Sequence, residues 1–134
     1  MSERNVEVVL RVLQLWNEGT DLSCWEPLHD PDVIVIAPEG WPEGSLSEGF
    51  DAWRLQAERL RETWDEARTE VDEIRPVGED RVFARVRYVT RRNNPEMSFD
   101  TPMAIVLDLR EGRITRAHYF WDDAQALEAA GLSE

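Results

Sequence analysis

The residues with acid or base chemistry near the end of this sequence are His118, Tyr119, Asp122 and Asp123, in the segment RAHYFWDD. A histidine titrates near neutral pH and can take or give a proton, and a carboxylate can act as a general base. The same residues also fit the end of a strand followed by the start of a helix. The two interpretations predict different functions, so the elements that position these residues must be considered.

A regular strand cannot direct both His118 and Tyr119 at one substrate, because successive side chains of a strand point to opposite faces. Asp122 precedes the helical segment AQALEAAG and has Gln125 three residues on, which is the spacing of a capping box. We therefore interpret the Asp122 carboxylate as an acceptor for free helix amides rather than as a catalytic group. His118 is interpreted as a partner of groups on the outer face of the sheet.

The net charge of the protein restricts the classes of molecule that it can bind. The 134 residues include 28 acidic and 15 basic side chains, which give a net charge of -13. Nucleic acids and anionic membranes are bound by neutralising phosphates, so neither is an expected partner. No apolar run approaches the ~20 residues of a membrane span, and the segment MSERNVEVV lacks the apolar core of a signal peptide. We expect one cytoplasmic domain over residues 1–134.

Residue types that the sequence lacks exclude several reactions. All fifteen basic residues are arginine, so lysine Schiff-base chemistry and a phosphate-loop lysine are excluded. Cys24 is the only cysteine, which excludes an intramolecular disulfide and a cysteine-rich metal site. With two histidines, a three-histidine metal site is excluded as well. We expect neither a metal nor a cofactor.

The first half of the sequence predicts three helices and one strand. Apolar residues at helical spacing predict a helix from Ser2 to the stop signal at 17–19. The segment DLSCWEPLH predicts a short second helix that ends near His29, VIVIA predicts a buried strand, and PEGWPEGSLSEG predicts a loop. Ser45 or Ser47 is expected to cap a third helix with an aromatic face.

The second half predicts an antiparallel meander. Four runs have the pattern of strands: ARTEVDEIRPV, RVFARVRYVTRR, SFDTPMAIVLDL and RITRAHYFW. Turn or loop signals separate them, namely GED, NNPE and REG. A short C-terminal helix follows. Helices in the first half and a meander in the second indicate an α+β fold, in which helices cover one face of a curved sheet.

Four segments together resemble the nuclear transport factor 2-like superfamily, in its SnoaL-like or ketosteroid-isomerase-like branch. They are VLQLWNEGTDL, HDPDVIVIAPEG, GFDAW and LREGRITRAHYFWDDAQALEAAGL. The resemblance implies a cone-shaped domain whose N-terminal helices and curved, mostly antiparallel sheet enclose an apolar pocket. It also implies a homodimer through the outer sheet face. Members include isomerases, dehydratases, epoxide hydrolases and polyketide cyclases, so the fold does not settle the function.

The catalytic positions that the resemblance implies are occupied by other residue types. The carboxylate base of ketosteroid isomerase falls on Ala37, its tyrosine falls on or near Val12, and its second aspartate falls within MAIVL. A carboxylate of limonene-epoxide hydrolase falls on Tyr119. The sequence therefore offers no clear catalytic residue, and Tyr119, Asp122 and His118 are weak candidates only.

The resemblance places one face of the last strand, with Tyr119 and Trp121, in the pocket and leaves His118 outside. The expected ligand contacts are Val12, Trp16, Ala37, Trp53, Tyr88, Met103, Tyr119 and Trp121. Six tryptophans are many for a small domain, and wide rigid rings suit the wall of a pocket. Tyr119 could form one hydrogen bond with a ligand, or be a core tyrosine bonded to backbone; both interpretations stay open.

Two functions from different classes follow. One is a domain that binds a small apolar or aromatic molecule without catalysis, which the absence of a convincing pocket carboxylate favours. The other is an isomerase, cyclase or dehydratase that acts on a polyketide- or steroid-like substrate. A scaffold with a filled pocket is a third. Arg85, Arg87 and Arg91 share one face of a strand, where they could pair across a dimer or surround an anionic ligand.

Overall fold

In the part of the chain that the structure describes, the fold is a six-stranded sheet with helices on both faces. A computed structural model describes residues 2–19, 21–38, 46–91 and 99–131. The helices are α1 (Ser2–Glu18), the 3-10 helix η1 (Leu22–Leu28), α2 (Phe50–Thr63) and α3 (Asp123–Ala129). The strands are β1 (His29–Ile36), β2 (Leu46–Glu48), β3 (Glu66–Val77), β4 (Arg81–Arg91), β5 (Phe99–Arg110) and β6 (Arg113–Phe120). The predicted α+β class is confirmed, and the elements follow the predicted order except for the additional strand β2.

The sheet is mostly antiparallel, with the strand order β2-β1-β6-β5-β4-β3. Strands β3 to β6 form the predicted meander, and β1 extends the sheet by pairing with β6 in parallel. A parallel pair needs a long connection, which here consists of α2 and the rest of the meander. The register places Ala84 opposite Ile105 and Val86 opposite Met103, so these four side chains share one face.

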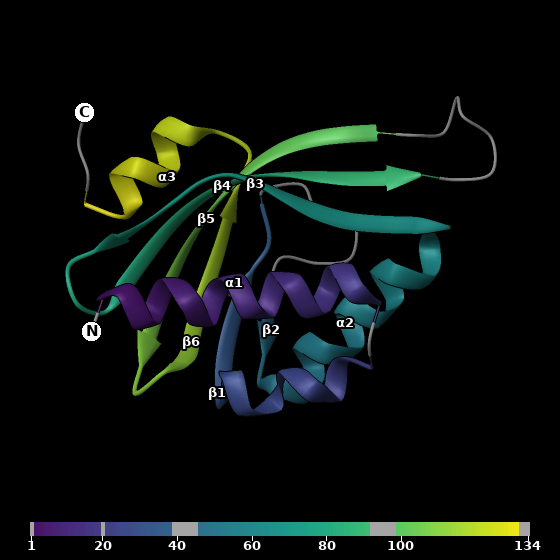
Figure 1. Cartoon of the computed structure of the whole chain (residues 1–134), viewed down its shortest axis with the longest axis horizontal. Coiled ribbons are helices and arrows are strands. Elements are labelled where there is room, and N and C mark those ends of the chain that lie inside the picture. Colours follow the sequence, from purple (N-terminus) through teal and green to yellow (C-terminus); the bar gives the residue numbers. More distant parts are fainter. Residues whose placement is uncertain (1, 20, 39–45, 92–98, 132–134) are drawn as a thin grey trace.

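That face is covered by α1, α2 and η1. Helix α1 buries the apolar side of its surface, with Val9, Val12 and Trp16 at intervals of three and four residues. The indole of Trp25 in η1 donates a hydrogen bond of 3.1 Å to the carbonyl of Val12, which fixes η1 against α1. Figure 1 shows α1, in purple, crossing the sheet on the side away from α3, in yellow.

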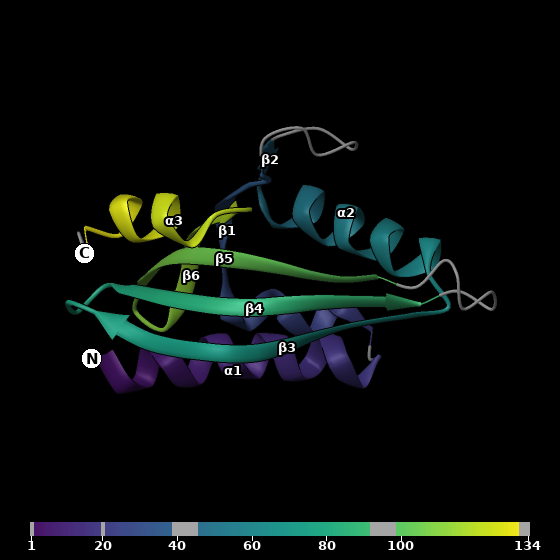
Figure 2. The same ribbon diagram turned by 90° about the horizontal axis from the view of Figure 1, so that it is seen from above.

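Helix α3 covers part of the opposite face. Figure 2 shows α1 and α3 separated by strands β3 to β5. Below α3, Phe83 and Val106 form a second small core with Ala126. The Asp122 carboxylate accepts a hydrogen bond of 2.7 Å from the amide of Ala124, so the predicted cap of the last helix is confirmed.

The start of α2 differs from the prediction. Ser45 lies outside the described residues, and Ser47 belongs to β2, within the segment predicted as a loop. Its hydroxyl donates a hydrogen bond to the side chain of Gln56 and does not accept one from a helix amide. Gly49 precedes the helix with a φ of 93°, a conformation that suits glycine, and its amide donates to the Val33 carbonyl at 2.7 Å. The turn NNPE also lies outside the described residues.

Candidate functional site

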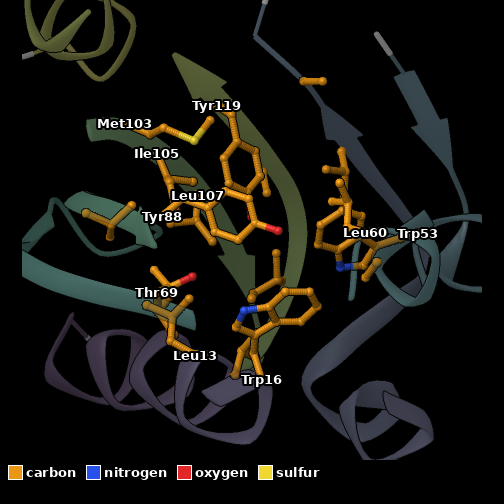
Figure 3. Close-up of a pocket in the computed structure, with 18 of the residues that line it drawn as sticks. Leu13, Trp16, Trp53, Leu60, Thr69, Tyr88, Met103, Ile105, Leu107 and Tyr119 are labelled. Atoms are coloured by element: carbon orange, nitrogen blue, oxygen red, sulfur yellow. The ribbon is translucent and has the colours of Figure 1, made fainter. Parts of the chain in front are cut away.

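A cavity of about 110 Å³ lies between the sheet and the helices α1, η1 and α2. Figure 3 shows side chains from α1, from α2 and from the sheet around a common space. The structure places seven of the eight residues expected as ligand contacts at its wall: Val12, Trp16, Ala37, Trp53, Tyr88, Met103 and Tyr119. The expected position of Trp121 is wrong: the side chain is 45% exposed and lies beyond the end of β6, where strand alternation no longer sets its direction.

Stacked tryptophan rings form the helix side of the cavity. The ring centroids of Trp16 and Trp25 are 6.1 Å apart, with 25° between the planes, and those of Trp25 and Trp53 are 5.7 Å apart, with 11° between the planes. On the sheet side, the ring centroid of Tyr88 lies 6.5 Å from that of Trp16, and the ring centroid of Tyr119 lies 6.4 Å from that of Trp53. Such rings give wide, rigid apolar surfaces with polar groups at their edges.

The indole N–H of Trp16 is buried in the cavity wall without a hydrogen-bond partner among the described residues. A buried polar group that lacks a partner costs about 1–3 kcal/mol. The sequence predicted the aromatic wall but gave no sign that Trp25 would bond to backbone while Trp16 would not. A ligand with an acceptor oxygen can supply the missing hydrogen-bond partner of the Trp16 N–H.

The backbone and ring of Trp16 are held from two sides. The Arg61 guanidinium donates a hydrogen bond of 2.9 Å to the Trp16 carbonyl, and it lies over the ring at 4.7 Å from the centroid. The next residue, Asn17, forms two hydrogen bonds with the backbone of Thr69 on β3. These contacts join α1, α2 and β3 at the cavity and fix the direction of the indole N–H.

Tyr119 presents a neutral hydroxyl to the cavity. Burial raises the pKa of the Tyr119 phenol well above its ordinary value, so the group stays protonated at physiological pH. No hydrogen bond from the described residues to this hydroxyl contributes to the raised pKa, whereas a core tyrosine would be bonded to backbone. It is therefore available as a donor or an acceptor.

A buried histidine that was not among the expected ligand contacts also lines the cavity. His29 is 3% exposed, and its Nδ1 lies 2.9 Å from the carbonyl oxygen of Trp25. Burial lowers the pKa of His29, and the hydrogen bond to Trp25 opposes this only in part, so the ring is neutral. The sequence prediction placed His29 at the end of a helix, whereas it begins β1 and is buried on it like Val33 and Val35. The segment HDPD before Val33 lacks the apolar pattern of a strand, so the sequence did not indicate this placement.

The other candidates for acid–base chemistry lie outside the cavity. His118 is on the opposite face of β6, where its ring stacks on Phe120 with 4.1 Å between the centroids. The predicted position of His118 outside the cavity is therefore confirmed. Burial, followed by the charge of Arg116, lowers its pKa. The Asp122 carboxylate caps α3 by accepting a hydrogen bond from the amide of Ala124.

The alternating arginines of β4 pair within the chain. Arg85 forms ion pairs of 2.6 Å with Glu73 and 3.2 Å with Asp123. Arg87 lies 2.9 Å from Glu70 and also pairs with two aspartates of neighbouring segments. Internal pairing thus accounts for these two side chains, which the sequence had left open between a dimer partner and an anionic ligand.

The cavity is uncharged. None of the described residues at its wall is an aspartate, glutamate, lysine or arginine. Among the described residues, no group of three or more histidine, cysteine or acidic side chains could hold a metal ion. No helix in the described ranges is long and apolar enough to cross a membrane. The arrangement can bind a neutral molecule through apolar contacts and a few hydrogen bonds.

A model of the SnoaL-like domain matches residues 9–117, which is most of the chain. None of the curated proteins matches the sequence.

Several solved structures have the same arrangement of elements. A putative SnoaL-like polyketide cyclase from Jannaschia sp. CCS1 has a TM-score of 0.75 at 20% identity, over 99% of this chain and 94% of that chain. TerC, co-crystallised with polyporic acid, has a TM-score of 0.75 at 18% identity, over 96% and 98% of the two chains. A hypothetical protein from Catenulispora acidiphila DSM 44928 has a ketosteroid-isomerase-like fold and a bound trimethylamine. Its TM-score is 0.74 at 20% identity, over 94% of this chain and 93% of that chain. At these identities the likeness shows the fold alone.

Proposed function

Because the chain belongs to the SnoaL-like domain family, a small-molecule-binding family of the nuclear transport factor 2-like superfamily, we propose that it binds a small, neutral, apolar or aromatic molecule in its cavity. The observation that carries the proposal is the indole N–H of Trp16, which is buried at an aromatic wall and lacks a partner in the described residues. A carbonyl or ether oxygen of the ligand would accept this hydrogen bond. The proposed contacts are Val12, Trp16, Ala37, Trp53, Tyr88, Met103 and Tyr119.

The size of the cavity supports a ligand built around one ring. Its volume of about 110 Å³ is somewhat smaller than that of an engineered apolar cavity of about 150 Å³ that binds benzene. A charged ligand is disfavoured, because burying an ion without a charged partner is costly. Most of the binding free energy therefore comes from burial of the ligand's apolar surface, and a few hydrogen bonds orient the ligand.

The test compares two probes of the same shape, benzaldehyde and styrene, by titration calorimetry. Only benzaldehyde carries an oxygen that accepts from Trp16, so we expect the protein to prefer it by about 3- to 10-fold, the worth of one neutral hydrogen bond. Trp16→Phe should abolish the preference, while the matched change Trp121→Phe, at an exposed position, should keep it. Failure of both probes to bind would refute the binding function.

A second candidate is an enzyme of the isomerase, cyclase or dehydratase kind that acts on a polyketide- or steroid-like substrate. What favours it is that Tyr119, a neutral donor, and His29, a neutral imidazole, line one cavity. Such a pair could assist loss of a proton next to a carbonyl. Acetophenone incubated with the protein in deuterium oxide would exchange its methyl protons faster than in buffer, and Tyr119→Phe would slow the exchange. Exchange no faster than in buffer would count against an enzyme.

We further propose that the protein forms a homodimer through the outer sheet face. Pairing of β1 with β2 places Ile34 and Leu46 on the face opposite the cavity, where they are 38% and 53% exposed. The stacked rings of His118 and Phe120 are on the same face of the neighbouring strand β6. Helix α3 covers β4 to β6 only in part, so these side chains leave an apolar surface that a second copy could cover.

A further inference from the structure

We propose that His29 forms a hydroxyl-binding subsite in the cavity, so that the ligand is a small alcohol or phenol whose O–H donates a hydrogen bond to Nε2 of His29. This inference rests on the proposed binding function and names the chemical class of its ligand. It uses a residue that no catalytic position implied by the family resemblance includes.

The tautomer of His29 follows from its one hydrogen bond. The carbonyl oxygen of Trp25 can only accept, so Nδ1, at 2.9 Å, must carry the proton. In a neutral ring the other nitrogen, Nε2, is then an acceptor. The described residues supply no donor to it. The ring therefore has a single acceptor atom, on a residue that lines the cavity.

The surroundings of His29 keep this acceptor neutral. The ring packs against Trp25 and Phe50, each with its centroid 5.5 Å away. Neither neighbour carries a charge that would stabilise an imidazolium, and desolvation disfavours the charged form. Nε2 of His29 has no donor among the described residues, so a ligand hydroxyl that reaches it gains a hydrogen bond.

The backbone holds His29 in a fixed place. It is the first residue of β1 and pairs with Ile114 of β6, and the register of that pair shifts between His29 and Ile34. In the shifted stretch, the Asp30 carboxylate accepts a hydrogen bond of 2.8 Å from the amide of Asp32. The hydrogen bond between Asp30 and Asp32 fixes the irregular stretch of β1 just after His29, and the hydrogen bond to Trp25 fixes the imidazole ring.

The subsite complements the donor at Trp16. Both rings pack on Trp25, Trp16 at 6.1 Å and His29 at 5.5 Å between centroids. The cavity thus has a donor and an acceptor beside one aromatic surface. This arrangement fits a hydroxylated aromatic ligand better than a hydrocarbon or a ligand whose oxygens only accept.

The experiment compares phenol with toluene, which has the same shape but no hydroxyl. We expect the protein to bind phenol about 3- to 10-fold more tightly, as one hydrogen bond allows. The informative variant is His29→Asn, because the asparagine amide can replace Nδ1 as donor to Trp25 but has no atom at the place of Nε2. This variant should lose the preference for phenol and keep its affinity for toluene. The matched control Thr69→Val also removes a polar group from the cavity wall and should keep the preference.

A second measurement does not depend on a variant. In the wild-type protein with ¹⁵N-labelled histidine, the spectrum of His29 should show the neutral form with the proton on Nδ1, and phenol should shift the Nε2 signal while toluene leaves it unchanged. A proton on Nε2, or equal binding of phenol and toluene, would overturn the subsite and leave the binding function intact. A phenol preference that survives in His29→Asn would assign the hydroxyl to Trp16 instead. If neither probe binds, the proposed function fails and the subsite with it.

Discussion

Asn17 and Thr69 are joined by a pair of hydrogen bonds between a side-chain amide and a strand. The Asn17 amide donates to the Thr69 carbonyl at 2.8 Å, and its oxygen accepts from the Thr69 N–H at 2.7 Å. The side chain thus takes the place of a neighbouring strand along β3. It binds the end of α1 to the sheet next to Trp16, so the helix and the cavity wall are fixed together.

The first prediction is that Asn17→Ala lowers the free energy of unfolding by about 1–3 kcal/mol, because two backbone groups of Thr69 lose their partner. Urea denaturation measures the effect. Gln14→Ala serves as the control: its exposed side chain bonds only to neighbours on α1, so the change should stay within about 0.5 kcal/mol. Equal effects of the two changes would contradict the role of Asn17.

Tyr119 provides a second prediction. Tyr119→Phe should weaken a ligand that bonds to the phenol by about 0.5–1.5 kcal/mol, the net contribution of one neutral hydrogen bond. The melting temperature should not fall, because the hydroxyl has no partner within the described residues. His118→Gln should leave ligand affinity unchanged. Loss of stability in Tyr119→Phe would mean that the hydroxyl is bonded inside the protein.

A third prediction concerns the dependence of stability on pH. The pKa of His29 is lowered from 6.5 by burial in the folded protein. Below about pH 6.5 the unfolded chain therefore binds a proton that the folded chain does not, and stability rises with pH across this window. Thermal unfolding should show stability falling as the pH drops below about 6.5 and no contribution from His29 above that value. His29→Asn should flatten the slope, while His118→Gln, at a more exposed ring, should largely keep it. An unchanged slope in His29→Asn would mean that His29 is not buried in its neutral form.

A fourth prediction is the homodimer. Sedimentation equilibrium at micromolar concentration should give twice the chain mass of 15.6 kDa. Ile34→Arg places a charge on the exposed apolar face and should yield the monomer. Leu55→Arg, at an exposed position of α2, is the matched control and should remain a dimer. A wild-type monomer would refute the interface.

The last prediction separates capping from catalysis at Asp122. Asp122→Ala should lower the free energy of unfolding by about 0.5–2 kcal/mol, since the Ala124 amide loses its acceptor, while Asp122→Asn should change little. Both are measured by urea denaturation. A loss of ligand binding or activity in Asp122→Asn, at an unchanged melting temperature, would return Asp122 to the catalytic candidates.

The features of the fold that local sequence patterns determine were predicted correctly. Apolar spacing predicted α1 and the meander, and strand alternation correctly separated Tyr119 from His118. The prediction failed where long-range pairing decides the structure. Ser47 pairs with β1 as part of β2, so it does not cap α2. Trp121 follows the last paired residue of β6, so its direction is not set by the sheet.

The candidate site was predicted less completely than the fold. A histidine between a short helix and a strand gives no local sign that its ring will be buried. His29 became visible only through its bond to Trp25 and its place on β1. Similarly, nothing in the sequence distinguishes the indole of Trp25, which bonds to Val12, from that of Trp16, because the distinction depends on how α1 and η1 cross.

The row of Trp16, Trp25 and Trp53 also gives the protein an optical property. Neighbouring indoles in this row are separated by 6.1 Å and 5.7 Å, distances at which an excited ring passes its energy to the next ring much faster than it emits light. Emission from the three rings is therefore coupled, and a molecule that quenches one of them also dims its neighbours. Entry of an unlabelled aromatic ligand should therefore be visible directly in the intrinsic fluorescence, with a larger change than a single tryptophan could give.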